Sequence, residues 1–367
     1  LILTVRHMKW KVLCFQKLLM VLSIICILCN YVFLLKLYDD VETQFLDMTK
    51  AFMTPPLQSS KEVVICLIQK DELNYLDEWT DYHLALGFSK IFIYDNSLDP
   101  IKMRRWRSKR DDREKLVLSF APGERQQMLA YRDCAKKASL LNFTWVCFLD
   151  VDEFLVLKEH ENVSSFLSEN RDKVQIMIYW QLYGTMGRQT YQPLPVLYRF
   201  QCRVAGLHPQ IGFTKAIVRL SALDTSVNFT SPHAFPLRNT TLFDVEAIYQ
   251  FPTSTAVVNH YFFRSHEEYV GKRQRGDVYY GGGGKFMLLE AISGIDVYTG
   301  QPIPNGSIYD DKAWRFLVSH IPKYASLPGV TKVGTNCDQF QDDVVKRAHN
   351  FTDYATLIRA FFNISSP

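Results

Sequence analysis

Short apolar segments alternate with longer segments of helical periodicity in the first half of this chain, and this alternation restricts its fold more than any other feature. Apolar strands that are separated by helices pair in parallel through right-handed crossovers. We therefore expect an α/β protein with a doubly wound, mostly parallel sheet, whose ligands bind outside the carboxyl ends of the strands. The expected strands are 63–69, 90–96, 116–120 and 145–150, and the expected helices are 72–86, 99–109 and 124–141.

The fourth apolar segment runs into an acidic motif. Residues 148–157 read FLDVDEFLVL, so Asp150 and Asp152 stand at the end of a strand with one residue between them. Side chains two apart on a strand point the same way, and two such carboxylates repel each other unless a cation lies between them. Mg2+ and Mn2+ take oxygen ligands of this kind. The motif predicts a metal site for a nucleotide-sugar diphosphate; the alternative is a pair of solvated acids that close a strand.

The alternation weakens after the acidic motif. We expect further strands at 174–183 and 215–220 and a basic helix at 264–275. Residues 279–286 read YYGGGGKF, and four consecutive glycines do not hold a fixed shape by themselves. This segment is expected to be a flexible lid or a plain linker, because it lacks the flanking residues of a phosphate-binding loop.

The amino-terminal region has the composition of a membrane anchor. Eighteen uncharged residues, most of them apolar, lie between Lys17 and Lys36, which is close to the shortest length that spans a bilayer. Basic residues precede them and acidic residues follow, which predicts a cytosolic tail and a lumenal domain. A cleaved signal peptide is the alternative. The expected parts are a tail (1–17), a signal anchor (18–37), a stem (38–61) and a lumenal domain (62–367), giving a single-pass type II protein of the Golgi or endoplasmic reticulum membrane.

Potential glycosylation sites support a lumenal domain independently of hydropathy. Seven Asn-x-Ser/Thr sequences occur, all of them after the expected anchor. The first directly precedes an expected core strand and is the one we least expect to be modified, because an acceptor must lie on an accessible loop. The seven acceptors are Asn142, Asn162, Asn228, Asn239, Asn305, Asn350 and Asn363.

The distribution of charge bears on nucleic-acid binding, and the number of cysteines bears on disulfide formation. The net charge of +4 comes from the basic amino-terminal tail, so no basic domain is present to bind nucleic acid. Five cysteines follow the anchor region, and an oxidising lumen would allow one or two disulfides, with at least one thiol left unpaired or intermolecular. These cysteines are Cys66, Cys134, Cys147, Cys202 and Cys337.

Five motifs in this order resemble those of the family 92 glycosyltransferases. The resemblance implies a GT-A fold, a nucleotide-sugar donor, a divalent cation and a glycan acceptor; for animal members of the family it implies inverting transfer of galactose. The motifs are KDELNYLDEWTDYHLALGFSKIFIYDNSLDP (70–100), FLDVDEFL (148–155), YWQLYGTMG (179–187), TKAIVR (214–219) and NHYFFRSHEEYVGKRQRG (259–276).

The resemblance also implies roles for individual residues in the metal site. Asp152 matches the position that ligates the metal directly, and Asp150 matches the position that contacts the metal or the ribose. Glu153 follows them and would orient them. His260 matches a late histidine that completes the metal site, and a neutral imidazole suits Mn2+. Without the resemblance, a histidine beside Tyr261 would be read as a packed core residue.

The resemblance assigns a second set of residues to the nucleotide-sugar donor. Basic side chains near the diphosphate would offset the charge of the leaving group, although the same residues also fit a solvated helix face. Residues that follow the first two strands should line the nucleoside pocket, although Glu72 also fits as a residue that favours the start of its helix. The donor-binding residues expected in addition to Asp150 are Lys70, Glu72, Tyr94, Asp95, Asn96, Lys272, Arg273 and Arg275.

The catalytic base is less well defined by the sequence. Asp244 and Glu246 are the candidates, because they lie downstream of the metal motif in the half that should face the acceptor. The chain also departs from the family where it reads Thr185-Met186-Gly187-Arg188, in place of a frequent Ser-Gly-His, and this leaves the choice of donor or acceptor open.

Two other classes of function are compatible with the same sequence. One is a lectin-like membrane protein that has lost turnover, against which the intact Asp150, Asp152 and His260 argue. The other is a nucleotidyltransferase or nucleotide-sugar hydrolase on the same fold, which would release product without a glycan acceptor. The preferred interpretation is a metal-dependent hexosyltransferase that uses UDP-galactose.

Overall fold

The structure is a computed structural model, and it describes residues 62–185, 188–204, 214–238, 248–251, 253–276, 278, 307–330 and 337. All of these belong to one compact unit. The predicted anchor and stem lie outside the described residues, as do the glycine-rich segment 279–286 and the two candidate bases Asp244 and Glu246. Within the described ranges, no helix combines the length and the apolar character that a bilayer crossing requires.

The amino-terminal half has the predicted alternation of strands and helices. Its four strands pair in parallel in the order β3-β2-β1-β4, and their bounds agree closely with the sequence pattern. One boundary differs, because β4 ends at Phe148, two residues before the predicted end. The elements are β1 (Val63–Gln69), α2 (Leu73–Ala85), β2 (Lys90–Asp95), α3 (Pro100–Ser108), η1 (Arg113–Lys115), β3 (Leu116–Phe120), α4 (Gln127–Leu140) and β4 (Trp145–Phe148).

The second half extends the same sheet with strands of both directions. The main-sheet strands are β5 (Glu153–Leu157), β6 (Gln175–Leu182), β8 (Thr214–Arg219), β9 (Ile248–Phe251) and β10 (Ala256–His260); β7 (Cys202–Val204) and β11 (Ser307–Tyr309) form a separate pair. The helices are α5 (Val163–Glu169), α6 (Val196–Arg199), α7 (His266–Arg275), α9 (Lys312–His320) and η2 (Pro322–Ser326).

Strand direction corrects part of the predicted topology. The nine-stranded sheet runs β3-β2-β1-β4-β8-β6-β10-β5, with β9 also paired to β6. β8 is antiparallel to both of its neighbours, and β10 is antiparallel to β5. The other five pairings are parallel. The fold is therefore a mixed α/β fold whose sheet is mostly parallel, as predicted, with antiparallel pairs around β8 and between β10 and β5 that the sequence pattern does not predict.

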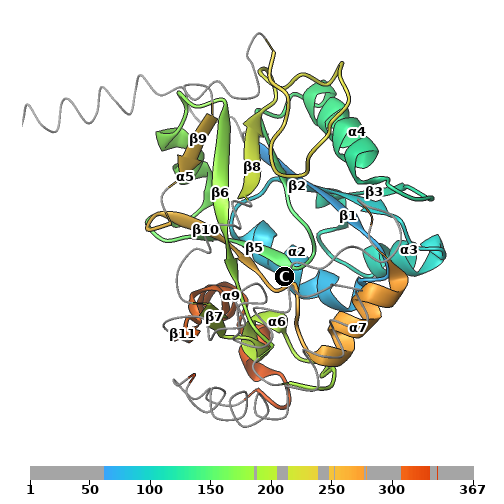
Figure 1. The fold of residues 1–367 in the computed structure, drawn as a ribbon, viewed down its shortest axis with the longest axis vertical. Coiled ribbons are helices and arrows are strands. Elements are labelled where there is room, and N and C mark those ends of the chain that lie inside the picture. The colour runs from blue at the N-terminus through green and yellow to red at the C-terminus, as the bar shows by residue number, and fades with distance from the viewer. Residues whose placement is uncertain are drawn as a thin grey trace, which may run out of the picture. The chain divides into compact units, whose positions relative to one another are not determined.

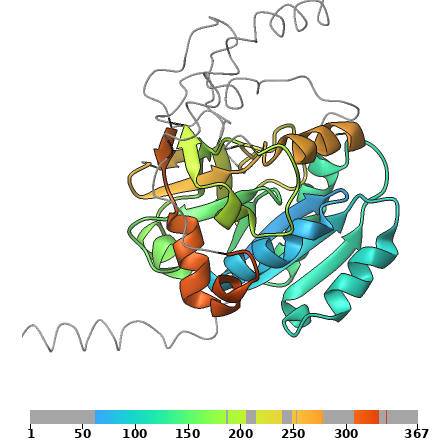
Figure 2. The same cartoon turned by 90° about the horizontal axis from the view of Figure 1, so that it is seen from below.

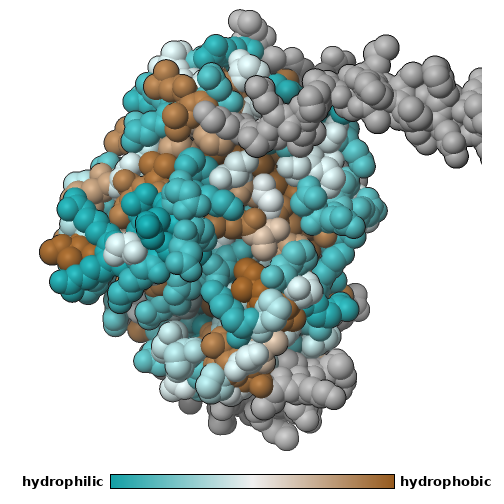
Figure 3. All heavy atoms as spheres, turned by 180° about the vertical axis from the view of Figure 1, so that it is seen from behind, coloured by the Kyte–Doolittle hydropathy of each residue, from teal (hydrophilic) through white to brown (hydrophobic). Residues whose placement is uncertain are grey.

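Helices cover both faces of the sheet, because alternate residues of its central strands are apolar on both sides. In β1, Val63 and Ile65 pack with Trp79 of α2, whereas Val64 packs with Tyr131 of α4. The edge at β3, with α3 beside it, lies to the right in Figures 1 and 2, and α9 lies to the left. On the surface seen in Figure 3, apolar side chains form small groups among hydrophilic ones, as on an ordinary globular domain.

Two disulfides tie distant parts of the chain together. Cys66 of β1 is bonded to Cys134 of α4, and Cys202 of β7 is bonded to Cys337. Cys147 is a free, buried thiol. The first disulfide joins the sheet to the helix that covers it, so it fixes the position of α4 against β1.

Candidate active site

The acidic motif lies in the tight turn between β4 and β5. The backbone N–H of Asp150 donates to the Oε2 of Glu153 (2.9 Å), and the backbone N–H of Glu153 donates to the carbonyl of Asp150 (3.0 Å). These reciprocal bonds fix the turn. Because Asp150 and Asp152 belong to a turn and not to a strand, the prediction that both carboxylates point together is wrong, and each has its own set of partners.

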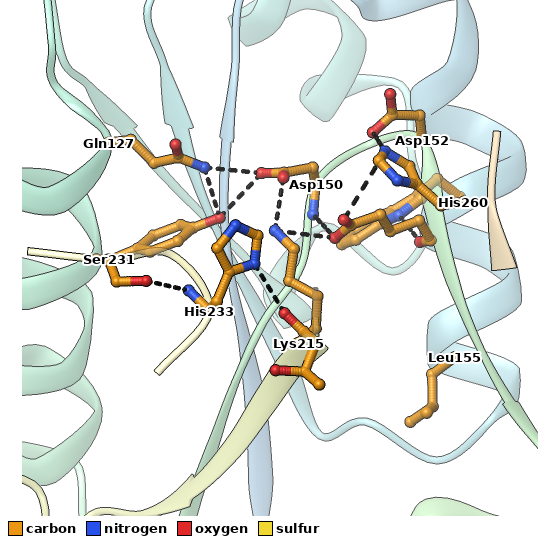
Figure 4. Close-up of polar contacts among 12 residues, drawn as sticks. Gln127, Asp150, Asp152, Leu155, Lys215, Ser231, His233 and His260 are labelled. Carbon is orange, nitrogen blue, oxygen red and sulfur yellow. Dashed lines mark hydrogen bonds and ion pairs between the residues drawn. The ribbon is translucent and has the colours of Figure 1, made fainter. Parts of the chain in front are cut away.

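Asp150 is held by side chains from α4 and β8. Its Oδ1 accepts hydrogen bonds from the Nε2 of Gln127 (2.9 Å) and the hydroxyl of Tyr131 (3.0 Å). Its Oδ2 accepts from the ammonium of Lys215 (2.6 Å), whose side chain is almost completely buried. Figure 4 shows Asp150 between Gln127 and Lys215. The Asp150 carboxylate is only partly exposed, and it already accepts hydrogen bonds from three side-chain donors. A cation or a ribose would bind to a carboxylate that these donors hold in place.

Asp152 faces a different group of residues. Its carboxylate is buried, with one oxygen bonded to the ammonium of Lys272 on α7. The other oxygen lies 3.6 Å from the Nε2 of His260, at the end of β10. The backbone carbonyl of Asp152 accepts from the N–H of Tyr261 (2.8 Å), so the turn is fixed against β10 as well. Figure 4 shows the imidazole of His260 directed at Asp152.

Side chains of α2 hold β5 in place. β5 is an edge strand, and its outer backbone groups are bonded by side chains spaced along α2. The indole N–H of Trp79 donates to the carbonyl of Glu153 (2.8 Å), and the hydroxyl of Tyr82 donates to the carbonyl of Leu155 (2.9 Å). The N–H of Leu155 donates to the Nε2 of His83 (3.4 Å). Burial lowers the pKa of His83 to about 3, so it stays neutral and accepts this bond.

The environment keeps Asp152 charged and His260 neutral. Burial by itself would raise the pKa of Asp152, but the ammonium of Lys272 outweighs burial and holds that pKa well below its ordinary value. Burial lowers the pKa of His260 despite the opposing effect of Asp152. The pair therefore offers a carboxylate oxygen and a neutral imidazole nitrogen, which are both metal-ligand types.

The other half of the site contains a buried lysine between two acids. Burial raises the pKa of Glu153 to about 8, although Lys215 opposes this shift from 3.1 Å. Burial would lower the pKa of Lys215, but Asp150 and Glu153 outweigh burial and raise it. The Lys215 ammonium is thus shared by Asp150 and Glu153, whereas Asp152 is paired with Lys272.

The donor set is compatible with a divalent cation that is completed by a ligand. No three or more His, Cys, Asp or Glu side chains in the described part of the chain are arranged to hold a metal by themselves. Mg2+ and Mn2+ are commonly held by one or two protein groups together with substrate phosphates and water. Asp152 and His260 provide such a partial set, and a buried oxygen of Glu153 and the Nδ1 of His260 have no hydrogen-bond partner.

A second polar cluster lies at the carboxyl ends of β1 and β2. The Oδ1 of Asp95 accepts from the side chain of Gln69 and from the N–H of Ser97 (3.0 Å). Its Oδ2 is buried and has no hydrogen-bond partner. The side chain of Asn96 is bonded to the carbonyls of Ala121 and Gly123. The unsatisfied Asp95 oxygen is suited to an N–H or O–H donor of a ligand.

Asp95 also lines a hollow of about 450 Å³ between α3 and β3. Arg104 and Arg107 contribute to its wall, whereas Asp150, Asp152 and His260 do not. The hollow is therefore distinct from the predicted metal site.

Ion pairs connect Glu72, one of the residues expected to line the nucleoside pocket, to α7. Glu72 pairs with Arg264 (3.2 Å) and with Arg275 of α7 (2.8 Å). Glu268, also in α7, forms a buried ion pair with Arg199 (2.7 Å) and accepts a hydrogen bond from the hydroxyl of Tyr75. The first turn of α7 is thus firmly attached to α2 and α6.

Comparison with known proteins identifies the family. The family model described as glycosyltransferase family 92 matches residues 61–278, more than half of the chain. The chain belongs to glycosyltransferase family 92. A glycosyltransferase family 92 protein of Ricinus communis is 26% identical over 231 residues, which cover 58% of this chain and 36% of the relative. One of Arabidopsis thaliana is 26% identical over 226 residues, which cover 58% and 37%. The chain thus spans less than two fifths of the length of these relatives.

Among solved structures, similarity is more distant. A mannosyltransferase from Pyrobaculum calidifontis, in complex with GDP-Man and Mn2+, matches 64% of this chain and 67% of its own at 13% identity and a TM-score of 0.34. This degree of similarity carries no argument about the site. The assignment to family 92 rests on the family model and the sequence relatives.

The structure of this family 92 chain brings most of the predicted site residues into two groups. Asp152, His260 and Lys272 form one group, and Asp150 lies next to it through Glu153. Asp95 and Asn96 lie at the ends of the neighbouring strands, with Glu72 just after β1 and Lys70 half-buried beside it. Tyr94 differs, because its hydroxyl donates to Asp133 of α4 (2.6 Å) and its ring packs under that helix. Arg273 lies in α7, but its side chain is outside the described residues.

Several residues of the family 92 site were missed by sequence reasoning. Lys215 is a charged residue directly before the apolar run Ala216–Val218 of β8, which was the available signal for its buried ion pairs. Arg264 has a positive φ of 52° and a buried guanidinium over the ring of Tyr75, and no sequence signal marked it. Trp180 of β6 lies between His260 (ring centroids 4.2 Å apart) and His233 (5.2 Å), and it places an aromatic ring beside the acidic motif.

Proposed function

We propose that this chain is a metal-dependent glycosyltransferase that transfers a hexose, galactose from UDP-galactose, to a glycan hydroxyl with inversion at the transferred carbon. Family membership supports transfer of a sugar. The observation that carries the metal-dependent part is the pairing of a buried, charged Asp152 with a neutral His260 at 3.6 Å. The nature of the sugar follows from the resemblance to animal members of the family.

The proposed metal would be held by Asp152 and His260, with Mn2+ favoured because imidazole is one of the ligands. When bound, the cation would stabilise the negative charge that develops on the diphosphate as the sugar departs. Asp150, fixed by Gln127 and Lys215, would accept a hydrogen bond from the ribose. The buried, unsatisfied oxygen of Asp95 would accept an N–H or O–H of the nucleoside.

Basic residues from α7 support binding of the diphosphate. Lys272 and Arg275 reach from α7 to Asp152 and Glu72, and so carry positive charge to the side of the site where the leaving group would lie. The acceptor hydroxyl would lose its proton to a carboxylate, for which Asp244 and Glu246 remain the candidates.

We further propose that the domain is lumenal and anchored in the Golgi or endoplasmic reticulum membrane by residues 18–37. Support comes from the apolar amino-terminal segment and the potential glycosylation sites. The two disulfides of the domain support an oxidising compartment.

A panel of nucleotide sugars, assayed with Mn2+ and with glycan acceptors, tests the proposed function. We expect UDP-galactose to be consumed only when an acceptor is present, with a new glycosidic product and loss of activity in chelator. Consumption without an acceptor would indicate a hydrolase instead. No consumption of any donor, together with retained glycan binding, would favour the lectin-like alternative.

A further inference from the structure

The Asp152 carboxylate, which would bind the metal, is already paired with a cationic side chain. One oxygen of Asp152 is bonded to the ammonium of Lys272, and the carboxylate is only 2% exposed. The other oxygen lies 3.6 Å from the Nε2 of His260, so the ammonium of Lys272 is the side-chain cation in hydrogen-bond contact with this buried carboxylate. Removing that charge without a replacement would leave an unpaired charge in the interior.

Lys272 differs from the other cations of the site in its freedom to move. Lys215 is 2% exposed and is shared by Asp150 and Glu153, so it is fixed on several sides. Lys272 is 21% exposed, and its ammonium lies 3.9 Å from the ring centroid of Phe262. A lysine has a long flexible stem, and its charged end can turn without a change in the backbone.

The helix that carries Lys272 does not need to move for this to happen. Glu268, one turn earlier in α7, is held by Arg199 and by the hydroxyl of Ser265, and Arg275, nearly one turn later, is held by Glu72. The base of the Lys272 side chain is therefore anchored on both sides, while its end remains partly in solvent.

We propose that Lys272 is a resident counter-ion of Asp152 that competes with the divalent cation and, once displaced from the carboxylate, pairs with the diphosphate of the nucleotide sugar. This inference rests on the proposed function and adds an order of events to it: the cation displaces Lys272 from Asp152, and the displaced ammonium then pairs with the diphosphate. A divalent cation and an ammonium group repel each other strongly on one buried carboxylate oxygen, so binding of one weakens binding of the other. The donor brings the negative charge that the displaced ammonium needs.

The proposal predicts that loss of the Lys272 charge has opposite effects on two ligands. In the Lys272→Gln variant, Mn2+ alone should bind about tenfold more tightly than in the unchanged protein, because it no longer displaces an ammonium group. UDP, measured at saturating Mn2+, should bind more weakly, because the diphosphate has lost a cation. A purely structural role for Lys272 would weaken both ligands.

Direct binding measurements on the full chain, purified in detergent, provide the test. Mn2+ binding is followed by electron paramagnetic resonance without nucleotide, and UDP binding by calorimetry with Mn2+ present. Lys102→Gln, a matched change at an exposed position of α3, should alter neither. Lys272→Arg keeps the charge and should bind Mn2+ as weakly as the unchanged protein, which separates the loss of charge from a loss of folding.

The outcomes distinguish this inference from the proposed function. Unchanged Mn2+ affinity in Lys272→Gln, with Mn2+ binding that is abolished by Asp152→Asn, would overturn competition by Lys272 but leave the metal site intact. Absence of Mn2+ binding in the unchanged protein would overturn both the inference and the metal-dependent part of the proposed function.

Discussion

At the scale of single residues, the two aspartates of the acidic motif are not equivalent. Asp150 accepts bonds from Gln127, Tyr131 and Lys215 on two elements, whereas Asp152 is buried against α7 and β10. This difference arises because both lie in a turn, where the alternation of a strand does not apply. The sequence located the motif but could not show these ion pairs. Lys215 lies 65 residues from Asp150 along the chain, and Lys272 lies 120 residues from Asp152.

The Asp152→Asn variant should lose transfer activity while keeping its fold. The amide retains the size of the carboxylate but removes the charge that a metal ligand supplies, so we expect the rate to fall by at least about a hundredfold. Initial rates with UDP-galactose and Mn2+ provide the measurement, with Asp172→Asn at an exposed position as the matched control. Equal rates in the variant and the control would show that the motif is structural.

At the scale of helices and strands, the amino-terminal alternation and the later strands β6 and β8 could be predicted, whereas β5, β10 and the directions of pairing in the second half could not. The strands β1 to β3 follow from apolar runs bounded by turn residues. The sequence pattern predicts neither β5, which lies within the acidic motif, nor β10, because both are short and their strand character depends on pairing with each other. The antiparallel insertion of β8 between β4 and β6 involves partners far apart in sequence, which local periodicity does not encode.

A buried acid that links two helices should make stability depend on pH. Glu78 of α2 accepts bonds from the first N–H groups of α6, at Val196 (2.6 Å) and Leu197 (2.9 Å). Burial raises its pKa from 4.5 to about 7. A raised pKa means that the folded state holds the proton more tightly than the unfolded state, so this contribution is complete below pH 4.5 and is lost as the pH rises through 7.

Comparison with Glu78→Gln tests this dependence. The free energy of unfolding of the unchanged protein, minus that of the variant, should fall by about 3 kcal/mol between pH 4 and pH 8. Urea unfolding at a series of pH values gives both curves. Two curves that stay parallel over this range would show that Glu78 ionises at the same pH in the folded and unfolded chain. Glu161→Gln, an exposed position, should follow the unchanged protein.

The disulfide between β1 and α4 is expected to contribute substantially to stability. It closes a loop with a sequence separation of 68 residues, and the loss of such a bond costs about 2–5 kcal/mol. The double variant Cys66→Ala with Cys134→Ala should therefore unfold at a lower denaturant concentration. A non-reduced peptide map that finds either cysteine free or bonded elsewhere would contradict the pairing.

At the scale of the whole molecule, the exposure of the potential glycosylation sites bears on the proposal that the domain is lumenal. Asn142 was expected to be the least accessible of the glycosylation sites, but it is exposed in the turn before β4, with a positive φ of 60°. Its position beside a core strand does not bury it, since the turn directs the side chain outward. Asn228 is exposed as well.

Expression of the full chain in a eukaryotic secretory cell should therefore give a glycoprotein. Glycosidase treatment should shift its band, and Asn142→Gln and Asn228→Gln should each remove one glycan, because both side chains are exposed. Asn74→Gln, an exposed asparagine outside any acceptor sequence, should leave the band unchanged. A chain with no shift would contradict the proposed lumenal orientation.

The pairing of β10 with β5 has a consequence for how this protein tolerates changes in length. His260 lies directly opposite Glu153, the residue after Asp152, in the antiparallel ladder. One residue inserted into or deleted from either strand would put Asn259 or Tyr261 in that place and turn the imidazole to the opposite face of the sheet. We therefore expect natural length variation to be absent from these two strands and to accumulate in the connection that carries α5, where an added residue changes no cross-strand partner.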